Sequence, residues 1–137
     1  MKAKLLFSFL LTLSLMQLMA QNARVWATYY GGTIYDVGNC VVTDASGNIY
    51  FAGYTSSTAG IASGGFQNTY GGGTYDAFLV KFDASGNRLW ATYFGNNNND
   101  HAYSIAIDHS GNVYLAGGTS SISGIASGGF QSTYGGG

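Results

Sequence analysis

Short runs of alternating apolar and polar residues recur along the chain, separated by clusters of glycine, serine, asparagine and aspartate. In the run from Ala77 to Phe82, every second position is a large apolar residue, namely Phe78, Val80 and Phe82. A period of two is typical of strands that bury one face, and the intervening residue types form turns. Further runs are Arg24–Tyr30, Cys40–Thr43, Ile49–Thr55, Arg88–Phe94, Ser104–Ile107 and Val113–Thr119. The pattern predicts an all-β protein.

The chain also repeats itself at an interval of 64 residues. That shift superimposes WATYY at Trp26 on WATYF at Trp90, GNIYFAG at Gly47 on GNVYLAG at Gly111, and IASGGFQNTYGGG at Ile61 on IASGGFQSTYGGG at Ile125. Each period holds four predicted strands, which is the content of one four-stranded antiparallel blade of a β-propeller. We therefore predict a partial β-propeller over residues 21–137, with repeats at about 26–89 and 90–137. The second repeat is truncated, so these two blades form an incomplete ring.

A five-residue motif stands between predicted strands, as DASGN at Asp44 and Asp83 and as DHSGN at Asp108. An aspartate carboxylate can accept hydrogen bonds from amides two residues on, and glycine supplies a positive φ, so the motif predicts a tight hairpin turn. Its oxygen atoms could suit Ca²⁺, but the motif lacks the further acidic residues of a calcium loop. We expect no metal site and no cofactor.

The segment from Ser56 to Tyr75 is rich in glycine and serine, and much of it recurs in the second repeat. We expect an ordered excursion between the second and third strands of the blade, held by the packing of Ile61, Phe66 and Tyr70. Loops on rigid scaffolds often carry function. A nearly unchanged copy in both repeats nevertheless favours a structural role.

Three blocks in fixed order resemble the SBBP β-propeller repeat of exported and surface proteins of bacteria: WATYYGG at Trp26, DASGNIYFAGYT at Asp44 and DAFLVKFD at Asp76. The resemblance covers essentially the whole chain after residue 20. The second copy departs from the pattern at residues 96–100, where NNNND replaces GTIYD of residues 32–36. The resemblance implies a propeller and an envelope or extracellular setting, and it implies no catalytic residues.

The first twenty residues have the layout of a secretory signal peptide. Lys2 and Lys4 precede an apolar run from Leu5 to Met19, and Ala20 offers a small residue for cleavage. The run is short and interrupted by polar residues, whereas a spanning helix needs roughly 20 predominantly apolar ones, which disfavours a retained anchor. We therefore expect a signal peptide at residues 1–20 and a secreted, extracellular or cell-surface protein.

Charge and cysteine content exclude further classes. The formal net charge is −1, and two of the five basic residues lie in the predicted signal peptide, so a nucleic-acid partner is not expected. The high content of aromatic residues argues against disorder. Cys40, the single cysteine, is matched by Ser104 in the second repeat, which favours a small strand residue over a nucleophile or metal ligand.

No catalytic constellation is found. His101 and His109, the two histidines, are matched by Val37 and Ala45 in the first repeat. The carboxylates of Asp36 and Asp100 recur, which favours a hydrogen-bonding role in the loop, because catalysis needs one asymmetric site. We therefore name no catalytic, cofactor-binding or metal-binding residues and expect a protein that is not an enzyme.

The leading functional hypothesis is an exported interaction scaffold with a protein or carbohydrate ligand, since aromatic rings offer apolar faces with a polar edge. The alternative is the propeller domain of an exported carbohydrate-active enzyme. Stacked repeats bury their apolar faces against neighbours. We therefore expect a fragment of a longer protein, further blades in cis or self-association to close the ring, partial exposure of Trp26 and Trp90, and poor solubility of the isolated chain.

Overall fold

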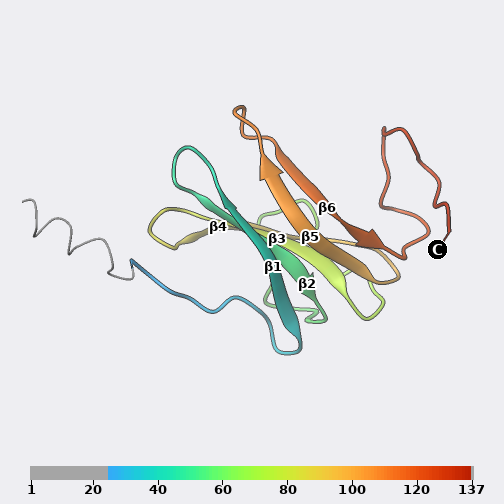
Figure 1. The fold of residues 1–137 in the computed structure, drawn as a ribbon. Coiled ribbons are helices and arrows are strands. Elements are labelled where there is room, and N and C mark those ends of the chain that lie inside the picture. The colour runs from blue at the N-terminus through green and yellow to red at the C-terminus, as the bar shows by residue number, and fades with distance from the viewer. Residues whose placement is uncertain (1–24, 137) are drawn as a thin grey trace, which may run out of the picture.

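The computed structural model describes residues 25–136, which fold into two antiparallel sheets (Figure 1). The first sheet has the order β1-β2-β3-β4, and β5 pairs with β6 in the second. The bounds are β1 Asp36–Thr43, β2 Ile49–Thr55, β3 Asp76–Phe82, β4 Arg88–Phe94, β5 Asp100–Ile107 and β6 Val113–Thr119. Within residues 25–136, this all-β architecture confirms the predicted class: it has one four-stranded blade and the first two strands of the next, and it forms no closed ring.

The structure confirms three predicted strands with the same bounds, namely β2, β4 and β6. β3 begins one residue before its predicted start, and β1 and β5 each begin four residues earlier than predicted. Both long strands contain a register shift, between Gly38 and Cys40 in β1 and between Ala102 and Ser104 in β5. A bulge interrupts the period of two, and for this reason the residues before it do not show a strand pattern in the sequence.

The strand predicted at Arg24–Tyr30 was wrong for the part that the structure describes, because residues 25–30 form no strand. Its match in the second repeat, β4, pairs with β3, whereas no third strand lies beside residues 25–30 in the described chain. The segment lies instead on the face of the first sheet. The Tyr30 hydroxyl donates to the Ile61 carbonyl at 2.9 Å, and the Trp26 indole donates to the Ala84 carbonyl at 3.1 Å. The predicted signal peptide lies outside the described residues.

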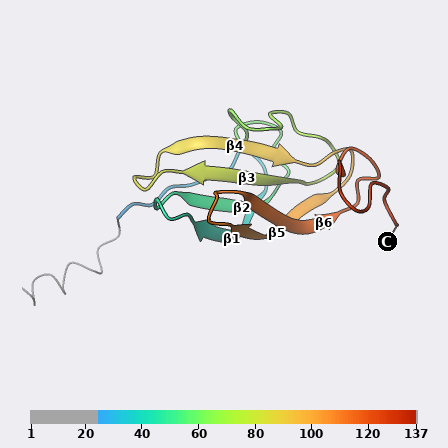
Figure 2. The same ribbon diagram turned by 90° about the horizontal axis from the view of Figure 1, so that it is seen from above.

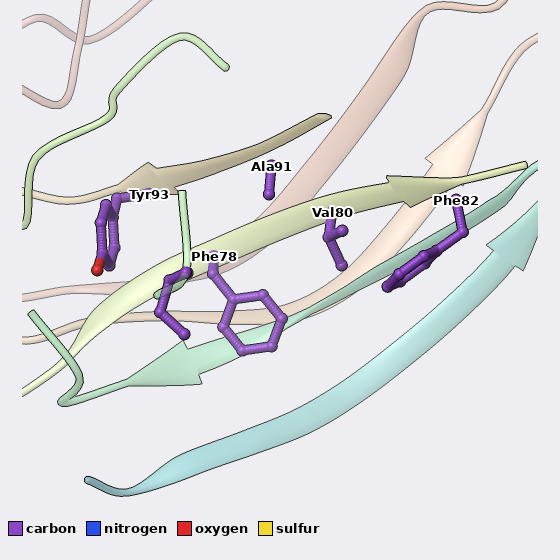
Figure 3. Close-up of a cluster of buried hydrophobic side chains, with 6 residues drawn as sticks. Phe78, Val80, Phe82, Ala91 and Tyr93 are labelled. Atoms are coloured by element: carbon purple, nitrogen blue, oxygen red, sulfur yellow. The ribbon is translucent and has the colours of Figure 1, made fainter. Parts of the chain in front are cut away.

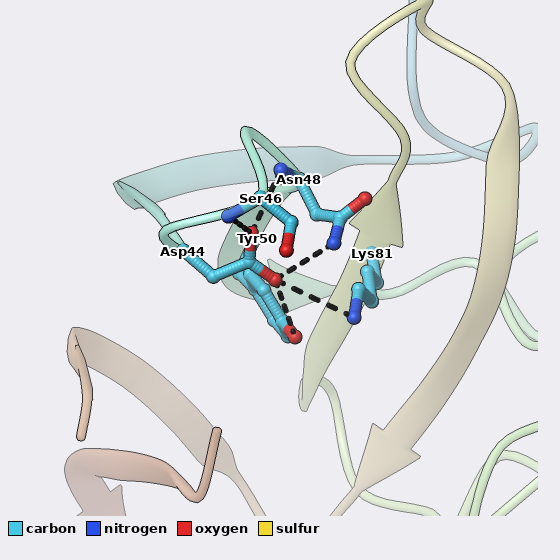
Figure 4. Close-up of polar contacts among 5 residues, drawn as sticks. All are labelled: Asp44, Ser46, Asn48, Tyr50 and Lys81. Carbon is cyan, nitrogen blue, oxygen red and sulfur yellow. Dashed lines mark hydrogen bonds and ion pairs between the residues drawn. The ribbon is translucent and has the colours of Figure 1, made fainter. Parts of the chain in front are cut away.

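The three DxSGN turns close the hairpins as predicted. At Asp44, Oδ1 accepts from the amides of Ser46 (3.0 Å) and Asn48 (2.9 Å), while Oδ2 accepts from the Asn48 side chain at 2.8 Å (Figure 4). Gly47 takes a φ of 78°, which glycine adopts at little cost. The turns at Asp83 and Asp108 repeat these bonds. These carboxylate oxygens therefore serve the turn itself.

The first sheet buries apolar residues on both faces. On one face, Phe78, Val80 and Phe82 of β3 pack with Ala91 and Tyr93 of β4 and with Ile61 (Figure 3). On the other face, Tyr50, Ala52 and Leu79 belong to a second cluster, which includes Ala102 of β5. β5 lies against β1, β2 and β3, so the second sheet covers the first (Figures 1 and 2).

The excursion over residues 56–75 is ordered and runs along the outer edge of β4. The Ser63 and Ala91 amides each donate to the other residue's carbonyl at 2.9 Å, and the Tyr93 amide donates to the Gln67 carbonyl at 2.9 Å. Edge strands expose unpaired backbone groups, and this loop satisfies part of that edge. Ile61 is buried and Tyr70 packs on Tyr93, as predicted.

The predicted packing of Phe66 was wrong, because its side chain is 89% exposed. Its neighbour Gly65 lies so close to β4 that a Cβ there would come within 2.4 Å of the Ala91 carbonyl oxygen. Backbone contact therefore holds this part of the loop, and the phenylalanine side chain is directed to solvent.

Tyr93→Phe is expected to destabilise the protein by about 1–2 kcal/mol, because it removes a buried donor from a carbonyl. The Tyr93 hydroxyl donates to the Ser57 carbonyl at 2.7 Å, and the residue is almost fully buried. Tyr70→Phe is the control, since its hydroxyl makes a longer bond of 3.3 Å to the Gly73 carbonyl in an exposed setting. Urea unfolding of both variants measures the difference. Equal losses would contradict the assignment.

Candidate binding site

The matched carboxylates Asp36 and Asp100 each fix the loop that leads into their strand. Asp36 accepts from the Gly32 amide at 2.8 Å, from the Ser57 hydroxyl at 3.2 Å and from the Thr55 hydroxyl. Asp100 repeats the set with the Asn96 amide (2.9 Å) and the hydroxyls of Ser121 (2.8 Å) and Thr119. The structure confirms the hydrogen-bonding role predicted for both residues.

Asp76 begins β3 and stands in register with Thr55, but the Thr55 hydroxyl donates to Asp36. Asp76 Oδ2 accepts from the Gly71 amide at 2.5 Å, and Oδ1 is buried without a partner among the described residues. A Cβ on Gly95 would lie 2.8 Å from both Asp76 Oδ1 and Asp100 Oδ2, so these two oxygens are no further apart than twice that distance. Burial, with the Asp100 charge as a smaller contribution, raises the pKa of Asp76 to about 6.

A carboxyl of raised pKa beside a second carboxyl group is an arrangement that glycosidases use for acid and base chemistry. Asp76 is 0% exposed and Asp100 is 2% exposed, however, so a substrate does not reach either group in this conformation. The two carboxyl groups are therefore buried neighbours at the starts of β3 and β5.

The other candidate residues of the sequence are placed apart from one another. Cys40 lies half-buried in β1, and burial raises the pKa of its thiol. His109 is exposed in the Asp108 turn. Over residues 25–136, no three His, Cys, Asp or Glu side chains come together in a way that could hold a metal ion. No helix in that range is long and apolar enough to cross a bilayer.

The structure brings together five aromatic side chains that sequence reasoning did not connect: Tyr35, Tyr54, Tyr75, His101 and Tyr103, here called the tyrosine–histidine cluster. Tyr54 is central, with ring centroids 4.6 Å from His101 and 5.1 Å from Tyr75, both edge to face. Tyr103 stacks on His101 at 5.9 Å with an interplanar angle of 15°. Tyr35 completes the group at 6.2 Å from Tyr75.

The cluster joins the two sheets at one end of their strands. Tyr35 precedes β1, Tyr54 is in β2, Tyr75 precedes β3, and His101 and Tyr103 belong to β5. Tyr35 and Tyr103 are 54% and 58% exposed, so the rings form part of the surface. Rings packed around Tyr54 remove water from its hydroxyl and raise its pKa, which keeps the phenol neutral.

The lysine and the arginine of residues 25–136, Lys81 and Arg88, lie away from this cluster. Lys81 pairs with Asp44 at 3.6 Å and lies over the Tyr50 ring at 4.8 Å, near the hairpin end of β2 and β3. Arg88 pairs with Phe82 at the last residue of β3, and its guanidinium donates to the Ile61 carbonyl. Tyr54 of the cluster pairs with Ala77 at the opposite end of β3. Among the described residues, the cluster thus gathers aromatic rings with hydroxyl and imidazole edges and contains no lysine or arginine.

A signal for the cluster was present in the sequence as breaks in the repeat. Tyr35 and Tyr54 are matched by Asn99 and Gly118, and His101 and Tyr103 are matched by Val37 and Asn39. A single binding site on a repeat protein requires positions where the repeats differ, and these four positions differ at the junction of two blades. Only the structure shows that residues from different repeats meet there.

Comparison with known proteins matches the chain to a repeat family and to a viral protein. A family model described as the SBBP beta-propeller repeat matches residues 89–123, which contain β5 and β6 and nearly all of β4. The chain is also 33% identical over 100 residues to an uncharacterized WD repeat-containing protein of Acanthamoeba polyphaga mimivirus. That alignment covers 68% of this chain and 7% of the viral protein, so the chain spans a small part of the relative's length.

Proposed function

The chain carries the SBBP beta-propeller repeat, and on that premise we propose that it is an exported scaffold that binds a neutral ligand through the tyrosine–histidine cluster. The exposed cluster, in which Tyr35, Tyr54, His101 and Tyr103 differ from their matches in the other repeat, is the observation that supports this function. The setting is the cell surface or the extracellular space. This proposal rests on the leader-like sequence of residues 1–20.

A carbohydrate fits the cluster best. A pyranose ring has an apolar face of C–H groups that can lie on an exposed aromatic ring, while its hydroxyls can bond to phenol and imidazole edges. The cluster contains no lysine or arginine among the described residues, which favours an uncharged ligand over a polyanion, because a polyanion requires basic partners. A protein ligand with an aromatic contact is the alternative, and it would use the same rings.

Tyr103→Ala and Tyr54→Ala are expected to weaken binding of neutral oligosaccharides by at least about tenfold, which corresponds to roughly 1.4 kcal/mol. Tyr29→Ala is the control, because that side chain is fully exposed and lies outside the cluster. A glycan array identifies the bound class, and titration calorimetry with the best oligosaccharide measures the affinities. Unchanged affinity in both cluster variants would refute the site.

The same oligosaccharides test the enzymatic alternative. We expect no release of new reducing ends on prolonged incubation, because the buried Asp76 and Asp100 pair is closed to substrate. Turnover that survives controls for contaminating activity would favour the carbohydrate-active enzyme instead. Fractionation of cells that produce the chain, with intact mass of the recovered protein, tests export and cleavage after Ala20.

A further inference from the structure

The contact between the two sheets is made by residues that the repeat duplicates. On β5 and β6, Ile105, Val113 and Leu115 face the first sheet. Together with Cys40 and Val42 of β1, they pack against the buried cluster that contains Tyr50, Ala52 and Leu79 of the first sheet. The Asn39 side chain also donates to the Ala102 carbonyl at 2.7 Å across the contact. One face of a second-repeat sheet therefore fits the opposite face of a first-repeat sheet.

The residues of β5 and β6 that make this contact have counterparts in β1 and β2, 64 residues earlier in the chain. Val41, Ile49 and Phe51, here called the receiving face, match Ile105, Val113 and Leu115. Val41 is 65% exposed, and the receiving face borders an apolar hollow of about 240 Å³ that Trp26, Tyr30 and Phe82 also line. Residues 25–30 thus cover this face only in part.

The residues of β1 and β2 on the other side of this contact likewise have counterparts in β5 and β6, 64 residues later in the chain. Ser104, Ala106, Tyr114 and Ala116, here called the covering face, match Cys40, Val42, Tyr50 and Ala52. Tyr114 is 57% exposed, whereas its match Tyr50 is 3% exposed, and Ala116 is exposed where Ala52 is buried. The difference between the repeats is that the covering face has no neighbouring sheet within residues 25–136.

We propose that a second copy of this chain occupies these faces, with the covering face of one copy docked on the receiving face of the next. The internal contact between the sheets is the template, because matched residues already make the same contact within one chain. The residues named on the two faces are uncharged, so docking requires no buried charge. The association is head to tail, and such heterologous contacts extend into rings or open chains.

Sedimentation velocity over a range of concentrations tests the proposal, since assembly must rise with concentration. Val41→Asp and Tyr114→Asp each place a carboxylate on one face, and each variant alone is expected to stay monomeric. Both sites are exposed, so the fold should tolerate the changes, and circular dichroism checks this. Ala116→Arg is a second variant of the covering face, and Ile122→Asp, an exposed position outside both faces, is the control that should still assemble.

Mixing the two monomeric variants gives the sharpest outcome. Val41→Asp keeps an intact covering face and Tyr114→Asp keeps an intact receiving face, so the mixture is expected to form a dimer and to stop there. A monomeric wild-type chain at about 100 μM, or a mixture that stays monomeric, would overturn the proposal. Because no ligand takes part, this result is independent of the carbohydrate assay.

Discussion

Gly117→Ala is expected to unpair β5 from β6, while Gly118→Ala, one residue further along the same strand, is expected to be tolerated. A Cβ on Gly117 would come within 1.8 Å of the His101 carbonyl oxygen. A Cβ on Gly118 meets no atom closer than 3.5 Å, on the Tyr103 ring. Neither glycine has a positive φ, so the two changes differ in space and not in backbone conformation.

The close approach at Gly117 comes from the bulge in β5, where the register shifts between Ala102 and Ser104. The first repeat shows the same feature. A Cβ on Gly53 would lie 1.8 Å from the Val37 carbonyl oxygen, beside the bulge between Gly38 and Cys40. A backbone carbonyl cannot move away as a flexible side chain can, so relief requires a shift of the whole strand.

We expect Gly53→Ala and Gly117→Ala each to cost about 3 kcal/mol, and Gly118→Ala to change stability by less than about 0.5 kcal/mol. Urea unfolding followed by tryptophan fluorescence gives these values, and amide hydrogen exchange locates the loss in the paired strands. Stability equal to the wild type in Gly117→Ala would show that the bulge adapts at little cost. Glycine at this position would then not be required by the close approach of the neighbouring strand.

The sequence was sufficient for the elements that repeat, and the reason is local. The DxSGN turns depend on an aspartate and on amides two to four residues away, so their hydrogen bonds follow from the motif itself. The alternating pattern likewise gave β2, β4 and β6 with correct bounds. In each case the interactions that define the element lie close together in the chain.

Long-range contacts account for what the sequence did not show. Residues 25–30 carry the pattern of β4, but a strand needs a neighbour, and that segment packs on the sheet through Tyr30 instead. The tyrosine–histidine cluster joins side chains from two repeats, so no single stretch contains it. The exposed Phe66 is a further case, because backbone contacts at Gly65 hold the loop where side-chain packing was expected.

The buried carboxyl of Asp76 is expected to make the protein less stable as the pH rises from about 4 to about 6. An aspartate in the unfolded chain titrates near 3.9. In the folded protein the pKa of Asp76 is raised to about 6, so between these values the folded state binds the proton more tightly. Its contribution to the free energy of unfolding is present below about pH 4 and is lost through about pH 6, by roughly 3 kcal/mol.

The charged groups around Asp76 support this sign. Asp100 on β5 contributes a negative charge, and the nearby phenols of Tyr70 and Tyr93 have raised pKa values and stay neutral over this range. The aspartates of the three turns act in the opposite direction. Their pKa values are lowered, chiefly by hydrogen bonds from asparagine side chains, so their stabilisation is lost as the pH falls below about 4.

Asp76→Asn is therefore expected to stabilise the protein at pH 7 by up to roughly 3 kcal/mol and to leave it nearly unchanged at pH 4. The oxygen of the asparagine side chain still accepts from the Gly71 backbone amide. Its NH₂ group takes the place of the buried Oδ1 and can donate toward Asp100, as the proton of the neutral carboxyl would. Asp83→Asn is the matched control with the opposite sign, because its amide would oppose the Asn87 side chain that now donates to the carboxylate at 2.9 Å. Urea unfolding at intervals between pH 4 and pH 7 separates the two cases. A wild-type stability that stays level or rises from pH 4 to pH 6, with no gain in Asp76→Asn at pH 7, would mean that Asp76 is ionised in the folded protein and finds its compensation in the backbone amides.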